Sequence, residues 1–166
     1  MNFNPADKVL ALDLATQWGW ASGRLNAEQP DAIGHRQIKS ANLGEFIEVF
    51  RLGLREVVAL TEPDIIVFES PILRGATTIM TLRKLYSMPA LVEHECHMTS
   101  TLVLEEDNNR VRAKFVSGKL PRKSKERKQA VLDACAWRKW EVANDDEGDA
   151  CALWWFTVTR LGNRIW

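Results

Sequence analysis

The chain has 166 residues, with 22 basic and 22 acidic side chains and therefore no formal net charge at neutral pH. This length favours one domain, residues 1–166, and excludes proteins that need two such domains. No apolar stretch approaches the roughly 20 residues that cross a bilayer, and the N-terminus lacks a signal-peptide pattern. The three cysteines (Cys96, Cys135 and Cys151) are widely spaced and odd in number, which argues against a disulfide framework. We therefore expect a soluble, cytoplasmic protein with no membrane partner.

The first forty residues predict three strands. Residues 8–14 are predicted as a buried strand, because Val9 to Leu12 form an apolar run that ends in an acid, Asp13. Residues 18–22 and 34–39 are predicted as antiparallel companions, because a polar loop with turn residues separates them.

A helix and a fourth strand follow. Asn42 and Glu45 have the spacing of an N-cap and a third-position carboxylate, and apolar residues then recur at helical spacing as far as Glu62. Pro63 ends this helix. The next run, Ile65 to Phe68, predicts a buried strand, and it too ends in an acid, Glu69.

The second half alternates in the same way. Residues 77–96 are predicted as a helix that Pro89 kinks or splits, and residues 101–104 as a short strand. Asp107 and Asn108 can cap a short helix. Ser124 is predicted to cap the next helix, and the last one starts near Asp145. The expected fold is an α/β protein with a mixed five-stranded sheet flanked by helices.

Four acids are placed where they can converge. Asp13 and Glu69 end two core strands, and Asp146 and Asp149 share one face at the start of the last helix. Any one of them alone is better explained as a solvated strand end or as a complement to the helix dipole. Together they would repel one another, and Mg²⁺ or Mn²⁺ would relieve that repulsion. We therefore expect two ions about 3.5–4 Å apart, an arrangement that cleaves phosphodiesters.

A basic segment follows the fifth predicted strand. Nine Lys and Arg residues but only one acid, Glu126, lie between Arg110 and Lys128, which gives this segment a local charge of about +8. Such a run suits contact with a phosphate backbone, although a solvated charged face explains Arg122 and Lys123 equally well. The candidate nucleic-acid-binding residues are Arg74, Lys114, Lys119, Lys125, Arg127 and Lys128, with Lys114 and Lys125 expected closest to the cut strand.

Three segments in this order carry a family resemblance: VLALDLATQWGWAS, EPDIIVFESP and DEGDACALWWF. With the basic stretch NNRVRAKFVSGKLPRKSKERKQAVLDA, they resemble the RuvC Holliday junction resolvases of the RNase H-like superfamily, from about Lys8 to Phe156. The resemblance implies a homodimer that binds a four-way DNA junction and nicks two strands symmetrically. It also implies that Asp13, Glu69, Asp146 and Asp149 are the metal-binding catalytic acids.

Two parts of the sequence depart from the pattern of that family. Its first motif usually reads Gly-Ile-Asp-Pro-Gly, whereas residues 11–15 here read Ala-Leu-Asp-Leu-Ala. Its members often place an aromatic residue three positions after the strand-four acid, where this chain has Ile72. These departures bear on junction opening and cleavage sequence, and they fit a divergent, bacteriophage-type relative better than the housekeeping enzyme.

Several other features of the sequence suggest different sites or functions. Residues 93–97, EHECH, offer three zinc ligands but no fourth, so a surface helix turn is the better interpretation. Most of the tryptophans are expected in the core or at a dimer interface rather than on bases. The first hairpin also resembles the phosphate-binding hairpin of sugar kinases and actin-like ATPases. A non-catalytic junction-binding protein and a nuclease for RNA/DNA hybrids or other branched DNA stay open as alternatives.

Overall fold

The computed structural model describes residues 3–71, 78–118 and 120–162. Its elements follow the order β1 (Lys8–Asp13), β2 (Gln17–Arg24), β3 (Ala32–Gln37), α1 (Leu43–Thr61), β4 (Ile65–Glu69), α2 (Ile79–Thr99), β5 (Leu102–Glu106), α3 (Asn108–Phe115), α4 (Ser124–Trp137) and α5 (Asp145–Gly162). Ile72, Arg74 and Lys119 lie outside the described residues. Within the described ranges, no helix combines the length and the apolar character of a bilayer-spanning segment.

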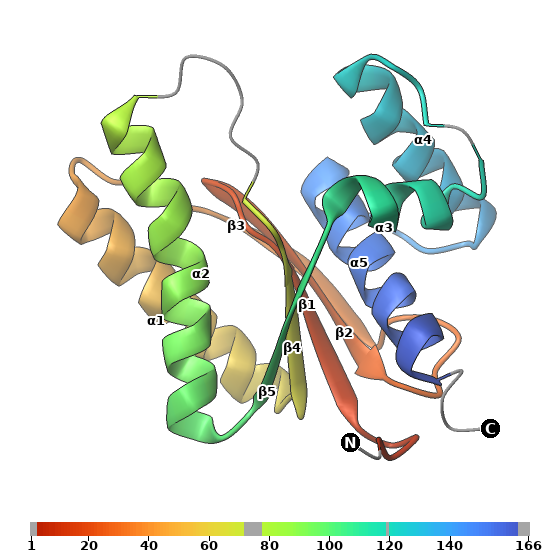
Figure 1. The fold of residues 1–166 in the computed structure, drawn as a ribbon, viewed down its shortest axis with the longest axis horizontal. Helices are drawn as coiled ribbons and strands as arrows, with labels where there is room; N and C mark the ends of the chain where they lie inside the picture. Colours follow the sequence, from red (N-terminus) through yellow and green to blue (C-terminus); the bar gives the residue numbers. More distant parts are fainter. Residues whose placement is uncertain (1–2, 72–77, 119, 163–166) are drawn as a thin grey trace.

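The strands form one mixed sheet in the order β3-β2-β1-β4-β5. The three N-terminal strands pair antiparallel, whereas β4 runs parallel to both β1 and β5. Helices cover both faces, with α1 and α2 on one side and α3, α4 and α5 on the other (Figure 1). The predicted fold class, a mixed five-stranded sheet flanked by helices, is therefore confirmed.

Alternation along β1 and β4 divides the core into two layers. Leu10 and Leu12 face α1 and α2, whereas Val9 and Ala11 face the layer that contains α5. Two residues further along each strand, the same alternation directs Asp13 and Glu69 toward the α5 side. The residues before them, Leu12 and Phe68, are partners in the parallel register, so the two acids end neighbouring strands at the same edge.

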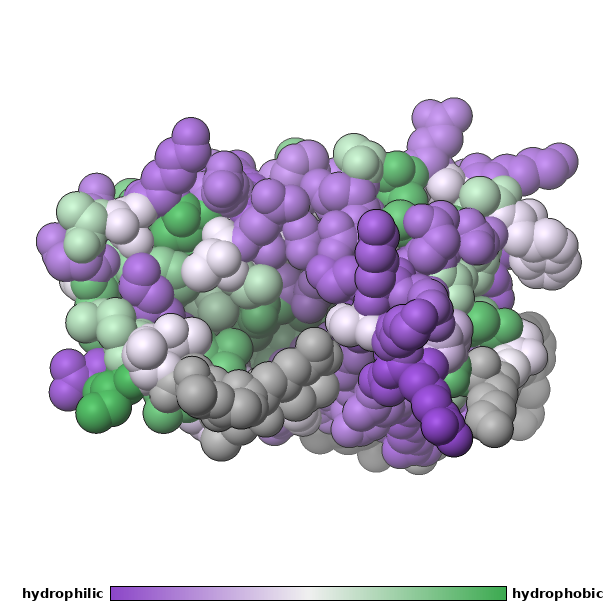
Figure 2. Space-filling view, turned by 90° about the horizontal axis from the view of Figure 1, so that it is seen from above, coloured by the Kyte–Doolittle hydropathy of each residue, from purple (hydrophilic) through white to green (hydrophobic). Residues whose placement is uncertain are grey.

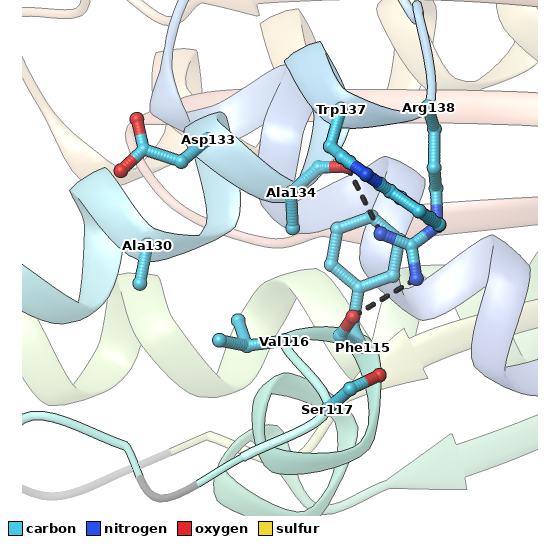
Figure 3. A pocket seen from close by; sticks show the side chains of 8 residues that line it. All are labelled: Phe115, Val116, Ser117, Ala130, Asp133, Ala134, Trp137 and Arg138. Carbon is cyan, nitrogen blue, oxygen red and sulfur yellow. Dashed lines mark hydrogen bonds between the residues drawn. The ribbon is translucent and has the colours of Figure 1, made fainter.

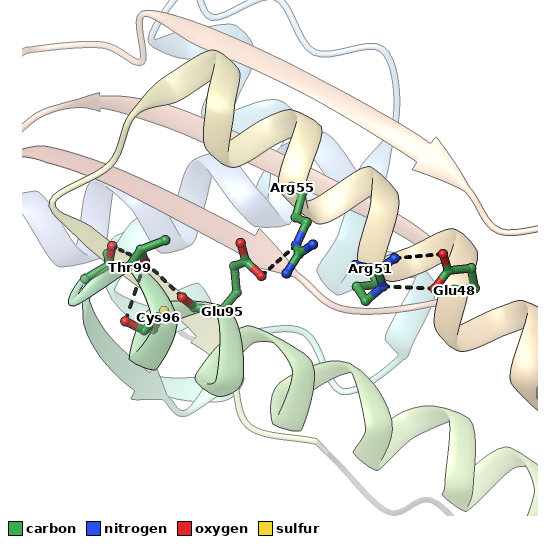
Figure 4. A network of polar contacts seen from close by, with 7 residues as sticks. Glu48, Arg51, Arg55, Glu95, Cys96 and Thr99 are labelled. Carbon is green, nitrogen blue, oxygen red and sulfur yellow. Dashed lines mark hydrogen bonds and ion pairs between the residues drawn. The ribbon is translucent and has the colours of Figure 1, made fainter.

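Polar contacts fasten the α1–α2 layer (Figure 4). Arg55 Nε donates to Glu95 Oε2 at 3.0 Å, linking the two helices, and Glu95 is almost fully buried. Near the end of α2, Thr99 Oγ1 donates to the carbonyl of Glu95 at 2.9 Å. The segment EHECH lies in these last turns, where Cys96 is buried and both histidines are exposed. It is the surface helix turn that the sequence indicated.

Of the two effects expected of Pro89, a kink or a split, the split does not occur, because α2 continues from Ile79 to Thr99. One local prediction was wrong. Ser124 does not cap α4: the amide of Arg127 already bonds to the carbonyl of Lys123, so the helix begins one residue earlier than a Ser124 cap would allow. By contrast, the predicted caps at Asn42 and Asp107 are confirmed, since each side chain accepts a backbone N–H three residues on.

The ends of α3 and α4 are held by Arg138 (Figure 3). Its guanidinium lies 4.2 Å from the centre of the Phe115 ring and donates to the carbonyls of Phe115 and Ala134 at 3.0 and 2.9 Å. A hollow of about 450 Å³ lies beside it. Trp137 borders this hollow and is 80% exposed, whereas Trp18, Trp20, Trp140 and Trp154 are buried in the core, as expected for most of the tryptophans.

Candidate active site

The four predicted acids lie around one hollow of about 270 Å³ at the edge of the sheet where β1 and β4 end. Its lining is formed by Asp13, Leu14, Ala15, Glu69, Ser70, Pro71, Leu85, Asn108, Arg112, Lys128, Asp146 and Asp149. Seen from above, hydrophilic side chains gather over the half of the molecule that holds α3 and α4, and a recess lies beside them (Figure 2). The hollow beside Trp137 is larger, but its only acidic lining residue is Asp133.

A glycine allows α5 to reach this edge of the sheet. Gly19 pairs with Asp13 in the β1–β2 ladder. A Cβ atom added to Gly19 would overlap the backbone carbonyl group of Asp146. The missing side chain therefore lets the first turn of α5 approach the sheet backbone directly, which places Asp146 and Asp149 beside the strand acids.

Each acid except Asp13 is held by a donor from another element. Arg112 donates from Nε to Asp149 Oδ1 at 2.8 Å, and its second donor reaches Oδ2, which makes the pair bidentate. Gln17 donates to Asp146 at 2.5 Å. Asn108 donates to Glu69 Oε2. The donors come from β2 and α3, so the site depends on the packing of several elements.

Burial and mutual repulsion raise the pKa of the strand acids. Burial raises the pKa of Glu69 to about 8, with a further contribution from the negative charge of Asp149. The pKa of Asp13 lies well above its usual range because of burial first, and because Glu69 and the two α5 acids surround it. Without a cation, these carboxyls therefore hold protons near neutral pH.

The α5 acids have neighbours that offset part of this effect. Burial raises the pKa of Asp149, although its pair with Arg112 opposes the shift. Burial likewise raises the pKa of Asp146, against the hydrogen bond from Gln17. At the rim, the hydrogen bond from Lys128 lowers the pKa of Asp145.

The donor set fits a hard divalent cation. Carboxylate oxygens are the ligands that Mg²⁺ and Mn²⁺ prefer, and Glu69 Oε1 is buried with no hydrogen-bond partner among the described residues. Among the described residues, no group of three or more His, Cys, Asp or Glu side chains is already arranged to hold a metal ion. Gln17 and Asn108 each bind one carboxylate oxygen, whereas Arg112 binds both oxygens of Asp149, so Asp149 would have to reorient to bind an ion.

The predicted basic residues are divided among different positions. Lys128 borders the acidic hollow and pairs with Asp145. Lys114 and Lys125 are exposed. Arg127 is half-buried and donates to the carbonyl of Pro121 at 2.7 Å, so it fastens the segment before α4.

Sequence reasoning missed three donors that hold the acids, namely Gln17, Asn108 and Arg112. Arg112 was counted only as part of the basic segment, yet it is buried and paired with Asp149. Asn108 was considered only as part of a helix cap, yet its side chain contacts Glu69. Asn108 and Arg112 are four residues apart on a helix that follows the acid-rich end of β5. This spacing places both side chains on one helical face, and it was the signal in the sequence that could have indicated their role.

Several solved structures share the fold of this chain. Thermus thermophilus RuvC in complex with a Holliday junction substrate has a TM-score of 0.68 and 10% identity, covering 96% of each chain. The yeast mitochondrial Holliday junction resolvase Ydc2 has a TM-score of 0.69 and 14% identity over 98% of this chain and 83% of that one. The chain has the RuvC fold. Fowlpox virus resolvase, solved with Holliday junction DNA, has a TM-score of 0.65 and 10% identity over 93% and 98% of the two chains.

Sequence comparison alone finds no relative. No family model matches the chain, and no curated protein matches it. The predicted resemblance to RuvC-like resolvases is nevertheless confirmed at the level of the fold, and so is its divergence, because the identities lie between 10% and 14%. The bacteriophage-type assignment stays a prediction.

Proposed function

We propose that this chain is a metal-dependent endonuclease that resolves four-way DNA junctions by nicking two strands symmetrically. The observation that carries the proposal is the meeting of Asp13, Glu69, Asp146 and Asp149 around one hollow, in a chain with the RuvC fold. Acids that repel one another on rigid elements lower the stability of the fold, and such clusters are typical of functional sites. Two of the similar structures, RuvC and the fowlpox resolvase, were solved with junction DNA.

The chemistry follows from the donor set. Two bound Mg²⁺ ions, for which Mn²⁺ can substitute, would activate a water for in-line attack on a phosphodiester and neutralise charge on the leaving oxygen. Asp13 and Glu69 would bind from the strand ends, and Asp146 and Asp149 from the helix. Because β1 and β4 are fixed by the sheet, they hold the first two carboxylates at a set separation.

Basic residues of this chain would orient the substrate. Lys128 borders the hollow, so its ammonium group can contact a phosphate beside the cut. Arg112 is enclosed and bound to Asp149; its charge offsets that of the acids instead of reaching the DNA backbone. Lys114 and Lys125, both exposed, would bind phosphates further along the strand.

Symmetric nicking needs two sites, and we propose that a homodimer supplies them. Helix α2 exposes Ile79, Met80, Tyr86 and Met98, with exposed fractions from 47% to 71%. Large apolar side chains gathered on one helix support burial against a second copy. The dimer would act on branched DNA in the cytoplasm.

A cleavage assay tests this function. The protein is incubated with a labelled four-way junction, a linear duplex and an RNA/DNA hybrid, with Mg²⁺ or with EDTA. We expect paired nicks in the junction alone, lost in EDTA and in Asp13→Asn and Glu69→Gln, while binding persists. Glu105→Gln, an exposed acid on β5, is the matched control and should cleave normally.

The other outcomes identify the alternatives. Cleavage of the hybrid or of other branched DNA would assign the nuclease to that substrate. Binding without cleavage at any divalent ion would indicate a junction-binding protein. Unchanged cleavage in the Asp13 and Glu69 variants would overturn the site assignment.

A further inference from the structure

Asn108 occupies the first position of α3, directly after β5 and the Asp107 cap. Its side chain lines the acidic hollow and is buried, with 7% of the residue exposed. Polar side chains with this degree of burial normally have every strong hydrogen-bonding atom paired. Asn108 does not meet this rule.

Asn108 and Glu69 each have one buried acceptor atom that is unpaired among the described residues. Asn108 Nδ2 donates to Glu69 Oε2. The remaining oxygen of each group, Asn108 Oδ1 and Glu69 Oε1, is buried and has no hydrogen-bond partner among the described residues. Leaving a buried acceptor without a hydrogen bond is unfavourable for folding. Both oxygens belong to residues that line one hollow, so a single electron-poor ligand can satisfy them together.

The neighbouring charges favour a cation over a neutral donor. The two basic side chains that border the hollow are engaged, Arg112 with Asp149 and Lys128 with Asp145. Their positive charges therefore offset these two acids and leave Asp13 and Glu69 without an ion-pair partner among the described residues. A bound cation would replace the protons of Asp13 and Glu69, offset the charges of the two carboxylates and satisfy the two unpaired oxygens at once.

We propose that Asn108 is a neutral oxygen ligand of the cation site, with Oδ1 facing the ion or one of its bound waters while Nδ2 holds Glu69 in place. This inference rests on the proposed function, because it needs the ion at the four acids. Amide carbonyl oxygens are accepted ligands of hard divalent cations. Because Asn108 and Arg112 are four residues apart, one face of α3 binds two acids. The Asn108 amide donates to Glu69, and the Arg112 guanidinium donates to Asp149.

Mn²⁺ binding measured by electron paramagnetic resonance and by calorimetry tests the proposal without relying on cleavage. Asn108→Leu removes both polar atoms, and we expect a 10- to 100-fold loss of Mn²⁺ affinity. Asn108→Asp keeps an oxygen ligand, so its affinity should equal or exceed that of the wild type. Without metal, the same variant should melt at a lower temperature because it adds a further carboxyl group to this cluster of acids. The neighbouring Asn109, which is exposed, supplies the control Asn109→Leu with unchanged affinity.

The outcomes separate the ligand from the function. Wild-type affinity in Asn108→Leu, or lost affinity in Asn108→Asp, would overturn the role of Asn108 and leave the nuclease proposal standing. Absence of Mn²⁺ binding to the wild-type protein would overturn both. If Asn108→Leu does not fold, as circular dichroism would show, Asn108→Asp alone still decides the matter.

Discussion

Replacing Glu69 by Gln should stabilise the metal-free protein, and the gain should depend on pH. Glutamine has nearly the shape of a protonated glutamic acid but never ionises. Burial raises the folded-state pKa of Glu69 from 4.5 to about 8. The wild-type protein therefore has its full stability below pH 4.5, where Glu69 is protonated in both the folded and the unfolded states. It loses part of this stability as the pH rises from 4.5 through about 8.

The size of the effect follows from that pKa. A tenfold change in proton affinity corresponds to about 1.4 kcal/mol, so a rise from 4.5 to about 8 gives an upper value of about 5 kcal/mol above pH 8. Relaxation and water entry reduce such values, and a gain of about 2–4 kcal/mol is the expected result for Glu69→Gln. Near pH 5 the two proteins should be almost equally stable.

Urea unfolding in EDTA, followed by tryptophan fluorescence from pH 5 to 9, measures the difference. Glu105→Gln is the matched control, because Glu105 lies on the neighbouring strand and is exposed. A Glu69→Gln gain that does not grow with pH would refute the reasoning. Added Mg²⁺ should then stabilise the wild type and leave Glu69→Gln almost unchanged.

Three further changes probe other parts of the structure. Arg112→Met should destabilise the protein by about 3–5 kcal/mol, because it leaves Asp149 buried without its partner, and adding Asp149→Asn should restore much of that loss in chemical denaturation. Gly19→Ala should lower junction cleavage by tenfold or more while junction binding persists, because its methyl group pushes the start of α5 away from the sheet. Changing Lys114 and Lys125 together to Ala should reduce the slope of log affinity against log salt by up to about two in a fluorescence titration.

Matched controls and contrary outcomes accompany these changes. Gly44→Ala adds a methyl group on the exposed side of α1 and should cleave normally. Lys8→Ala, at the opposite end of β1 from Asp13, should leave the salt slope unchanged. Equal losses in Gly19→Ala and Gly44→Ala would contradict the role given to Gly19. Failure of Asp149→Asn to rescue Arg112→Met would show that Arg112 stabilises the fold by packing alone.

Most of the fold could be predicted because the signals are local. The apolar runs of β1 and β4 and the N-caps of α1 and α3 each depend on residues close together in the sequence. The convergence of the acids was predictable for a related reason. Parallel strands end at the same edge of a sheet, so Asp13 and Glu69 had to approach once their strands became neighbours.

The rest depends on contacts between distant segments. Nothing near Arg112 shows that it meets Asp149, which is 37 positions away, instead of solvent. The contact between α5 and β2 joins positions more than a hundred residues apart, and the sequence around Gly19 does not indicate this contact. The start of α4 was misjudged by one residue because serine next to a helix start is a common cap, and the backbone bond of Arg127 decided otherwise.

The direct seating of α5 on Gly19 affects how such a protein can diverge. In most layered folds, the separation between a helix and a sheet is set by the side chains between them, so each core substitution changes it. Here the first turn of α5 rests on the backbone of β2 where the acids are held. Side chains farther along α5 can then be replaced without moving this end of the helix. The position of the α5 acids relative to the sheet can therefore be retained while most of the surrounding sequence changes.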